Sequence, residues 1–242
     1  MSDKGRGTDR DHPLFEMAPL FEFTHVSVRG AGDQWRLRDV NGRIPAAGVT
    51  AVLGPSGSGK STLLRCCNRL EAPAEGTVAF RGTDVARLDV LQLRRRVAMV
   101  FQRPAPFPGT GRDNLLAADP NLDDDRGAAL LERVRLDPDF LDRNATELSG
   151  GEAQRLCLAR ALVVSPEVVL MDEVTSSVDP VTTRALEDLA RSLAEGGTPV
   201  VWVTHDLAQA RRLADAMLVV VHGHIAGRDE ADAFVKDHVD DE

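Results

Sequence analysis

The segment GPSGSGKS at residues 54–61 constrains the fold of this chain more than any other feature. It matches the pattern G-x-x-x-x-G-K-[ST] in full and lies between a continuous apolar run, VTAVL, and a helix-like segment, STLLRCCNRL. Glycines let successive backbone N–H groups turn inward around phosphate oxygens, and the following helix adds its own unpaired N–H groups. The segment therefore predicts a phosphate-binding turn between a buried strand and a helix.

We expect this turn to hold the phosphates of a nucleotide, with the Lys60 ammonium on the β- and γ-phosphates and the Ser61 hydroxyl on Mg²⁺. The alternative is a glycine-rich turn that binds nothing. The predicted nucleotide-binding residues are Gly54, Pro55, Ser56, Gly57, Ser58, Gly59, Lys60, Ser61 and Thr62.

Short buried strands alternate with helices along most of the chain. Apolar runs that favour strands lie at 21–28, 49–54, 97–101, 168–172, 200–205 and 216–221, and helical patterns lie at 61–70, 151–164, 181–194 and 207–214. This alternation predicts an α/β fold with a mainly parallel sheet. The polar–apolar alternation of the first run predicts a half-exposed strand, as at an antiparallel edge.

One region interrupts this rhythm. Between Pro104 and Glu147 there are acidic loops and short helical patterns but no buried strand, which predicts a small helical subdomain, at about 104–164, inserted into the α/β core. We expect residues 1–18 to form a mobile tail and not a signal peptide, and 19–242 to form one domain.

Charge and cysteine content exclude several classes of protein. The formal net charge of −9 disfavours nucleic acid as the main partner, because phosphate backbones require clustered Lys and Arg. Cys66, Cys67 and Cys157 lie in apolar or helical patterns and are expected to be buried free thiols in a reducing compartment. No run approaches the roughly 20 apolar residues that span a bilayer.

Polar residues follow three of the predicted strands. Asp172 and Glu173 end VVLMDE, so Asp172 is expected to hold Mg²⁺ and Glu173 to polarise the attacking water. His205 ends VVWVTH and is expected to contact the γ-phosphate, because ligands bind at the carboxyl ends of such strands. Gln102 follows VAMVF and is expected to touch Mg²⁺ and the water.

A further segment, LSGGEAQR at 148–155, decides among nucleotide-binding families. Together with the Lys60 loop, VFQ (100–102), MDE (171–173), SSVDP (176–180) and THD (204–206), it closely resembles the ATP-binding cassette family over about 21–227. The resemblance implies a P-loop NTPase core of the RecA-like type, with ATP and Mg²⁺ as ligands. It also implies a dimer of cassettes and an integral membrane permease as partner, at the cytoplasmic face of the cell membrane.

In such a dimer each ATP lies between the glycine-rich loop of one copy and Ser149, Gly150 and Gly151 of the other. The residues agree with this, because Ser149-Gly150-Gly151 directly precedes a helix and forms a second phosphate-type helix N-terminus. The resemblance also places Asp179 at the dimer seam.

Some residues depart from the family's pattern. The chain has no Tyr, so an aromatic partner for adenine is missing near residues 30–31, and Trp35 is expected either to stack on the base or to be a core residue. Val174 stands where most members have proline, and the inserted helical region is short. Phe107 is expected to be either an exposed anchor for the permease or a core residue.

The leading hypothesis is the ATP-hydrolysing subunit of a transporter for a small inorganic solute. FQRPAPFP resembles phosphate-import ATPases, whereas the short insert and DEVTSSVD resemble cassettes for iron or other metal efflux. Two alternatives are a soluble cassette ATPase of DNA repair or translation, and a small-molecule P-loop kinase. His222 and His224 in HGH are too few to predict a metal site.

Overall fold

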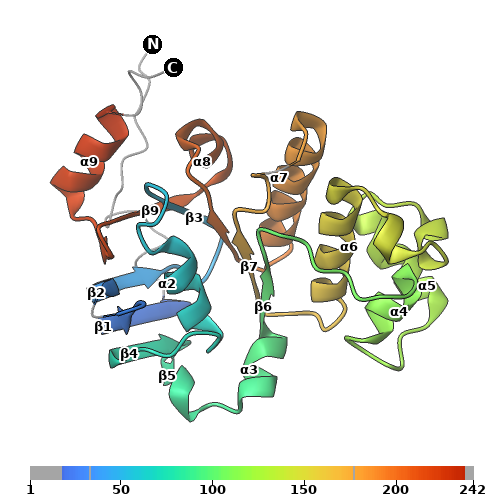
Figure 1. Cartoon of the computed structure of the whole chain (residues 1–242), viewed down its shortest axis with the longest axis horizontal. Helices are drawn as coiled ribbons and strands as arrows, with labels where there is room; N and C mark the ends of the chain where they lie inside the picture. The colour runs from blue at the N-terminus through green and yellow to red at the C-terminus, as the bar shows by residue number, and fades with distance from the viewer. Residues whose placement is uncertain (1–17, 33, 177, 238–242) are drawn as a thin grey trace. The chain divides into compact units, whose positions relative to one another are not determined.

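The computed structural model describes residues 18–32, 34–176 and 178–237, which fall into two compact units (Figure 1). The first unit contains the described residues up to Leu93 and from Val201 onward, and the second contains Arg94–Val200. The tail expected for 1–18 falls outside the described residues except for Ala18.

An antiparallel sheet forms the N-terminal part of the first unit. Its strands, in the order β2-β1-β4-β5, are β1 (Phe21–Arg29), β2 (Trp35–Ile44), β4 (Glu75–Phe80) and β5 (Thr83–Asp84). Phe21 and Phe23 near the start of β1 are buried, as are the consecutive residues Val26, Ser27 and Val28. Phe21 packs against Phe80 of β4 with ring centroids 5.1 Å apart. The predicted antiparallel edge is confirmed.

A second set of strands in this unit follows the order β10-β9-β3-β8: β3 (Val49–Leu53), β8 (Val200–Val203), β9 (Ala216–Val221) and β10 (His224–Ile225). β3 pairs in parallel with β9, and all five residues of β3 are buried. The helices of this unit are α2 (Lys60–Cys67), α8 (Leu207–Leu213), α9 (Arg228–Asp237) and the 3-10 turn η1 (Val85–Arg87). α3 (Val90–Arg96) runs across the boundary into the second unit.

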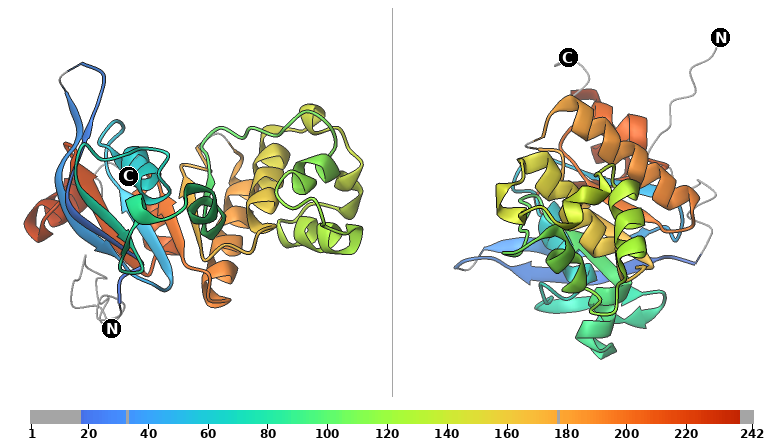
Figure 2. Two further views of the ribbon diagram at one scale, coloured as in Figure 1. Left: turned by 90° about the horizontal axis from the view of Figure 1, so that it is seen from below. Right: turned by 90° about the vertical axis from the view of Figure 1, so that its right-hand side faces the viewer.

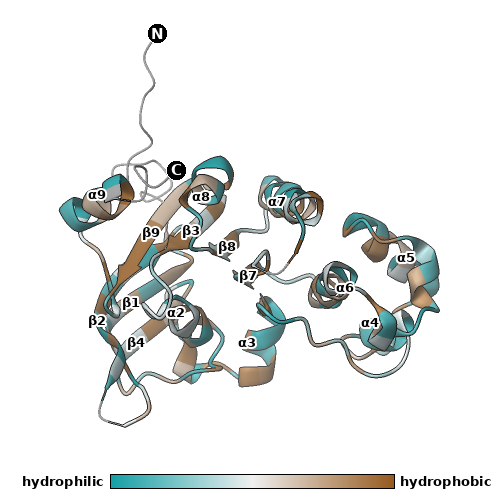
Figure 3. Cartoon of the chain, turned by 45° about the horizontal axis from the view of Figure 1, so that its top comes forward, coloured by the Kyte–Doolittle hydropathy of each residue, from teal (hydrophilic) through white to brown (hydrophobic). Residues whose placement is uncertain are grey.

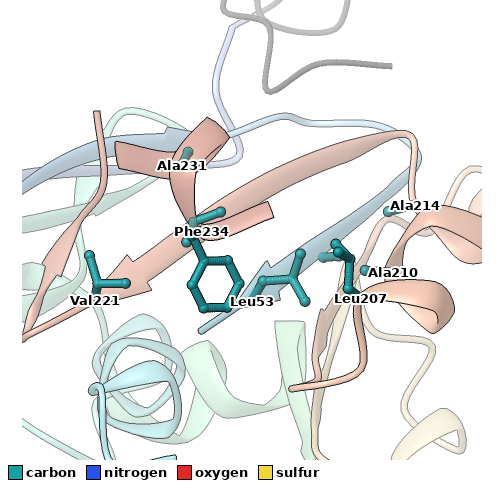
Figure 4. Close-up of a cluster of buried hydrophobic side chains, with 9 residues drawn as sticks. Leu53, Leu207, Ala210, Ala214, Val221, Ala231 and Phe234 are labelled. Atoms are coloured by element: carbon teal, nitrogen blue, oxygen red, sulfur yellow. The ribbon is translucent and has the colours of Figure 1, made fainter. Parts of the chain in front are cut away.

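The C-terminal helix closes one side of the first unit's core. Phe234 of α9 points toward Leu53 of β3, and Ala231 and Val221 complete the same cluster of buried side chains (Figure 4). α9 carries both hydrophobic and hydrophilic residues (Figure 3), as expected of a helix that buries one face only. This cluster holds β3, the strand that leads into the glycine-rich loop.

The second unit combines two parallel strands with helices. β6 (Val97–Val100) pairs with β7 (Val168–Asp172), and the helices are α4 (Gly111–Leu116), α5 (Asp124–Arg133), α6 (Gly150–Leu162) and α7 (Pro180–Glu195), with 3-10 turns η2 (Pro138–Leu141) and η3 (Ala145–Glu147). Figure 2 shows α4, α5 and α6 as a helical group. That residues 104–164 form an inserted subdomain remains a prediction.

The α/β fold with mainly parallel core strands is therefore confirmed. The structure adds β2, β4, α3 and α9, which the sequence patterns did not identify.

Among the described residues, no helix is long and apolar enough to cross a membrane. Cys66, Cys67 and Cys157 are buried free thiols, and burial raises the pKa of Cys66 to about 12.

Candidate active site

The glycine-rich loop connects buried β3 to α2, as predicted, and two of its glycines are required by the fold itself. A Cβ on Gly54, where φ is +146°, would lie 2.0 Å from the carbonyl oxygen of Val220. A Cβ on Gly59, where φ is +109°, would lie 2.8 Å from the carbonyl oxygen of Arg36. No side chain fits at either position, so the loop backbone is held in place by its neighbours.

The loop wraps around the ammonium group of Lys60. This side chain is 4% exposed, and its Nζ donates hydrogen bonds of 2.9 Å to the carbonyl oxygens of both Gly54 and Pro55. The Ser58 hydroxyl is buried and has no hydrogen-bond partner within the described part of the chain. A buried cation inside a ring of backbone groups, beside an unsatisfied hydroxyl, fits an anionic ligand.

His205 belongs to the same unit as this loop. It follows β8, and its side chain is exposed, whereas the neighbouring Thr204 is buried. Asp206 then caps α8 by accepting a hydrogen bond of 2.8 Å from the Gln209 N–H. The strand thus ends in a tight turn that presents His205 to solvent at its carboxyl end.

The predicted catalytic acids lie in the second unit, at the end of β7. Asp172 is 2% exposed. The next residue, Glu173, has a positive φ of +47°, a conformation that costs a non-glycine residue about 1–3 kcal/mol and is often found at functional sites. This turn separates the two acids, leaving Asp172 in the core and Glu173 half-buried at the strand's end.

Gln102 lies against Glu173. Its Nε2 donates to Oε2 of Glu173 at 3.1 Å and to the hydroxyl of Ser176 at 3.3 Å. The sequence placed both residues at strand ends but did not predict this pair. These two bonds place the Gln102 amide between the Glu173 carboxylate and the Ser176 hydroxyl.

The segment Ser149–Gly151, called here the signature loop, comprises the N-cap of α6, Ser149, and the first two residues of the helix, so the helix begins earlier than the sequence predicted. The Ser149 N–H donates to Oε2 of Glu152 at 2.8 Å, and the Ser149 hydroxyl accepts a longer bond of 3.4 Å from the Glu152 N–H. These bonds with Ser149 lower the pKa of Glu152. Gly150 has open space around its Cα, so α6 presents an uncovered N-terminus of the predicted kind.

Asp179 caps the neighbouring helix α7. It accepts hydrogen bonds from the Thr182 hydroxyl at 2.6 Å, the Val181 N–H at 2.9 Å and the Thr182 N–H at 3.0 Å. The Thr182 hydroxyl contributes most to lowering the pKa of Asp179. Ser177, within the segment SSVDP, lies outside the described residues. The expected position of Asp179 at the interface between two cassettes stays a prediction.

The segment 101–107 is held by hydrogen bonds to α6 and to Asn114 of α4. Gln154, 1% exposed, donates to the carbonyl oxygen of Phe101 at 3.0 Å, and Arg160 donates to that of Ala105 at 3.1 Å. Buried Asn114 accepts from the Phe107 N–H at 2.7 Å. The sequence analysis did not identify Gln154, Arg160 or Asn114, because their roles depend on contacts between distant segments.

The structure describes two aromatic residues for which the sequence left alternatives open, and it decides between them for Phe107. Phe107 is 50% exposed, so the interpretation as a core residue is wrong. Trp35 is half-buried at the start of β2, and the Arg29 guanidinium lies 4.6 Å from its ring centroid.

His224 contacts Glu230 at 3.0 Å, and no group of three or more potential His, Cys, Asp or Glu ligands occurs within 18–32, 34–176 and 178–237.

The predicted site residues thus fall into two sets, each ordered within its own unit. The first unit holds the loop 54–62 and His205, and the second holds Gln102, Asp172, Glu173, the signature loop and Asp179. Both sets include a helix N-terminus preceded by glycine or serine. One chain therefore contains two helix N-termini of the kind that binds phosphate, one in each unit.

Comparisons with known proteins agree with this reading. A family profile described as ABC transporter matches residues 37–176. The chain is 42% identical over 221 residues to Phosphate import ATP-binding protein PstB 3 of Natronomonas pharaonis, covering 84% of this chain and 78% of that one. It is 44% identical over 208 residues to ABC transporter I family member 17 of Arabidopsis thaliana, covering 83% and 79%.

Among solved structures, the chain is similar to an ATP-binding cassette in a dimeric post-hydrolysis state bound to ADP and Pi. The TM-score is 0.77 at 28% identity, and the match covers 87% of this chain and 98% of that one. The fold is that of the P-loop NTPases. From the profile match, the relatives and the two helix ends, we conclude that this chain belongs to the ABC transporter family and is an ATP-binding, ATP-hydrolysing cassette.

Proposed function

We propose that this cassette is the nucleotide-binding subunit of a membrane transporter and works as a pair of copies around two ATP molecules. The carrying observation is the presence of two phosphate-type helix ends in one chain, at Lys60 and at the signature loop. We assign the second helix end around each triphosphate to the other copy of the chain. The dimeric cassette among the similar structures supports this arrangement.

Within each site, Lys60 binds the β- and γ-phosphates, Glu173 polarises the attacking water and His205 contacts the γ-phosphate. We assign Mg²⁺ to Ser61, Gln102 and Asp172. One carboxylate, one hydroxyl and one amide oxygen are the hard oxygen donors that Mg²⁺ takes together with phosphate oxygens and water. An ion held by these residues would neutralise charge on the transferred phosphoryl group.

The permease contact is assigned to the segment 101–107. Phe101 and Phe107 are among the exposed large hydrophobic residues, at 43% and 50% exposure. Because this segment begins beside Gln102, which bonds to Glu173, a change at the catalytic base reaches it directly. This assignment places the cassette at the cytoplasmic face of a membrane.

The proposed cargo is phosphate, carried inward, because a 42% identical relative is named for phosphate import and a second such relative is 38% identical. Iron or another metal, carried outward, is the competing cargo. A soluble cassette of DNA repair or translation is the alternative from another class, and the net charge of −9 disfavours it.

Light scattering of Glu173→Gln with and without Mg²⁺ and ATP tests the paired site. Removal of the general base leaves binding intact and blocks hydrolysis, so an ATP-dependent shift from monomer to dimer is expected. The double variant Lys60→Ala, Glu173→Gln serves as control and remains monomeric. A Glu173→Gln chain that binds ATP and stays monomeric contradicts the proposal for the isolated chain.

Cargo is tested with the membrane protein that co-purifies with this chain. The complex is reconstituted in vesicles with ATP on the cassette side, and movement of radiolabelled phosphate is compared with that of iron. ATP-dependent phosphate movement supports the leading assignment, and iron movement without phosphate movement replaces it. Stimulation of hydrolysis by DNA or ribosomes, with no membrane protein recovered, supports the soluble alternative.

A further inference from the structure

Thr182 touches two functional elements of the second unit at once. Its hydroxyl donates the 2.6 Å hydrogen bond to Oδ2 of Asp179. Its Oγ1 and Cγ2 also lie 3.2 Å from the point where a Cβ on Gly151 would be. One short side chain, on the first turn of α7, therefore stands between the last residue of the signature loop and Asp179.

Both contacts are restrictive. A hydrogen bond to an ionised carboxylate is short and directional, so it fixes the orientation of Asp179. Against Gly151, the Thr182 side chain fills the space that any larger residue in the signature loop would need. The separation between the loop and Asp179 is consequently set by the dimensions of a threonine.

We infer that Thr182 is a positioning residue that holds the signature loop and Asp179 at the spacing a second copy requires. This inference rests on the proposed pairing of two cassettes, in which both elements face the other copy. When two elements are held together before association, less conformational freedom is lost on binding. Thr182 then favours dimer formation and links the two ATP sites, while nucleotide binding to a single chain depends on the loop 54–61.

The test separates the two contacts with two variants in the Glu173→Gln background. Thr182→Val keeps the shape and the methyl group but removes the hydroxyl, and Thr182→Ser keeps the hydroxyl. Thr183→Val makes the same chemical change one residue along α7 and is the matched control. Dimer dissociation constants with Mg²⁺ and ATP come from light scattering over a protein concentration series. Monomer affinity comes from a fluorescent ATP analogue at low protein concentration.

Thr182→Val is expected to raise the dimer dissociation constant about tenfold, equivalent to about 1.4 kcal/mol, without a change in monomer affinity. Thr183→Val is expected to stay close to the parent. Thr182→Ser keeps the hydrogen bond to Asp179 but loses the methyl group that lies against Gly151, so its dimer dissociation constant is expected to lie between those of the parent and Thr182→Val. In the chain that retains Glu173, Thr182→Val is expected to lower the Hill coefficient of ATP hydrolysis. A purely structural role would not change cooperativity while sparing monomer binding.

Three results overturn the inference. Thr182→Val has the same dimer dissociation constant as its parent, or Thr183→Val weakens the dimer as much as Thr182→Val does. In the third, Thr182→Val weakens ATP binding by the monomer by as large a factor as it weakens the dimer. These outcomes leave the proposed pairing intact, because the parent still dimerises. If the parent Glu173→Gln itself stays monomeric with ATP bound, the pairing of isolated chains is wrong and the inference is overturned with it.

Discussion

The guanidinium carbon of Arg160 lies 4.2 Å from the ring centroid of Phe107, over an aromatic residue that is half exposed. The same guanidinium donates to the carbonyl oxygen of Ala105 and to Oδ1 of Asn114. Pro104, Pro106 and Pro108 alternate through this stretch and restrict its backbone. The segment assigned to the permease is therefore a stiff element held from α6.

Arg160→Ala is expected to loosen this segment, because it removes a cation–π contact and two hydrogen bonds from a charged donor. The amide of Phe107 should exchange with deuterium faster, and the free energy of unfolding should fall by about 2 kcal/mol. Arg160→Lys keeps the positive charge but lacks the planar guanidinium group. Its exchange rate and its free energy of unfolding should lie between those of the unsubstituted chain and of Arg160→Ala. Unchanged exchange at residues 105–110 in Arg160→Ala would show that Asn114 alone holds the segment.

Lys60→Ala is expected to lower ATP hydrolysis by about 100-fold or more, because it removes the cation that we propose binds the transferred phosphate. Lys236→Ala removes an exposed lysine of the first unit and is the control, with expected turnover equal to the unsubstituted chain. Phosphate release measured over a range of ATP concentrations checks both. Wild-type turnover in Lys60→Ala would exclude the glycine-rich loop from catalysis.

Gly54→Ala and Gly57→Ala are expected to differ in stability although both change a glycine of one loop. The first places a methyl group 2.0 Å from the Val220 carbonyl oxygen, whereas the second has open space and only a left-handed φ of +77°. Chemical denaturation should show a loss of at least about 2 kcal/mol for Gly54→Ala and about 1 kcal/mol for Gly57→Ala. Equal losses would mean that the loop backbone moves freely away from β9.

Ser149→Arg is expected to abolish the ATP-dependent dimer and leave ATP binding by the monomer intact. The long cationic side chain would cover the open N-terminus of α6, while the loop 54–61 belongs to the other unit. Ser192→Arg, at an exposed position of α7, controls for the added charge. If Ser149→Arg abolished ATP binding by the monomer, the signature loop would act within its own chain.

Local patterns predicted the parts of the site that depend on neighbouring residues in the chain. β3, the loop at Gly54 and α2 follow from a buried run, a glycine pattern and a helical pattern in direct succession. The same holds for β7 and Asp172. Strands β2 and β4 were missed because their exposed faces are polar and their burial depends on pairing with β1.

Contacts between distant segments could not be predicted in this way. The bond from Gln102 to Glu173 joins residues 71 positions apart, and that from Gln154 to Phe101 joins residues 53 apart. The positive φ of Glu173 is likewise not a preference of glutamate but follows from the surrounding fold. Residue type indicated the chemistry, whereas packing determined which side chains meet.

The hydrogen bonds of Lys60 to the carbonyl oxygens of Gly54 and Pro55 have a consequence for nucleotide binding. They use two of the three donors of the ammonium group and hold it at a fixed place in the loop, where the residue is 4% exposed. The orientation of this charge and its removal from water are therefore part of the folded loop, and binding of a phosphate does not have to supply them.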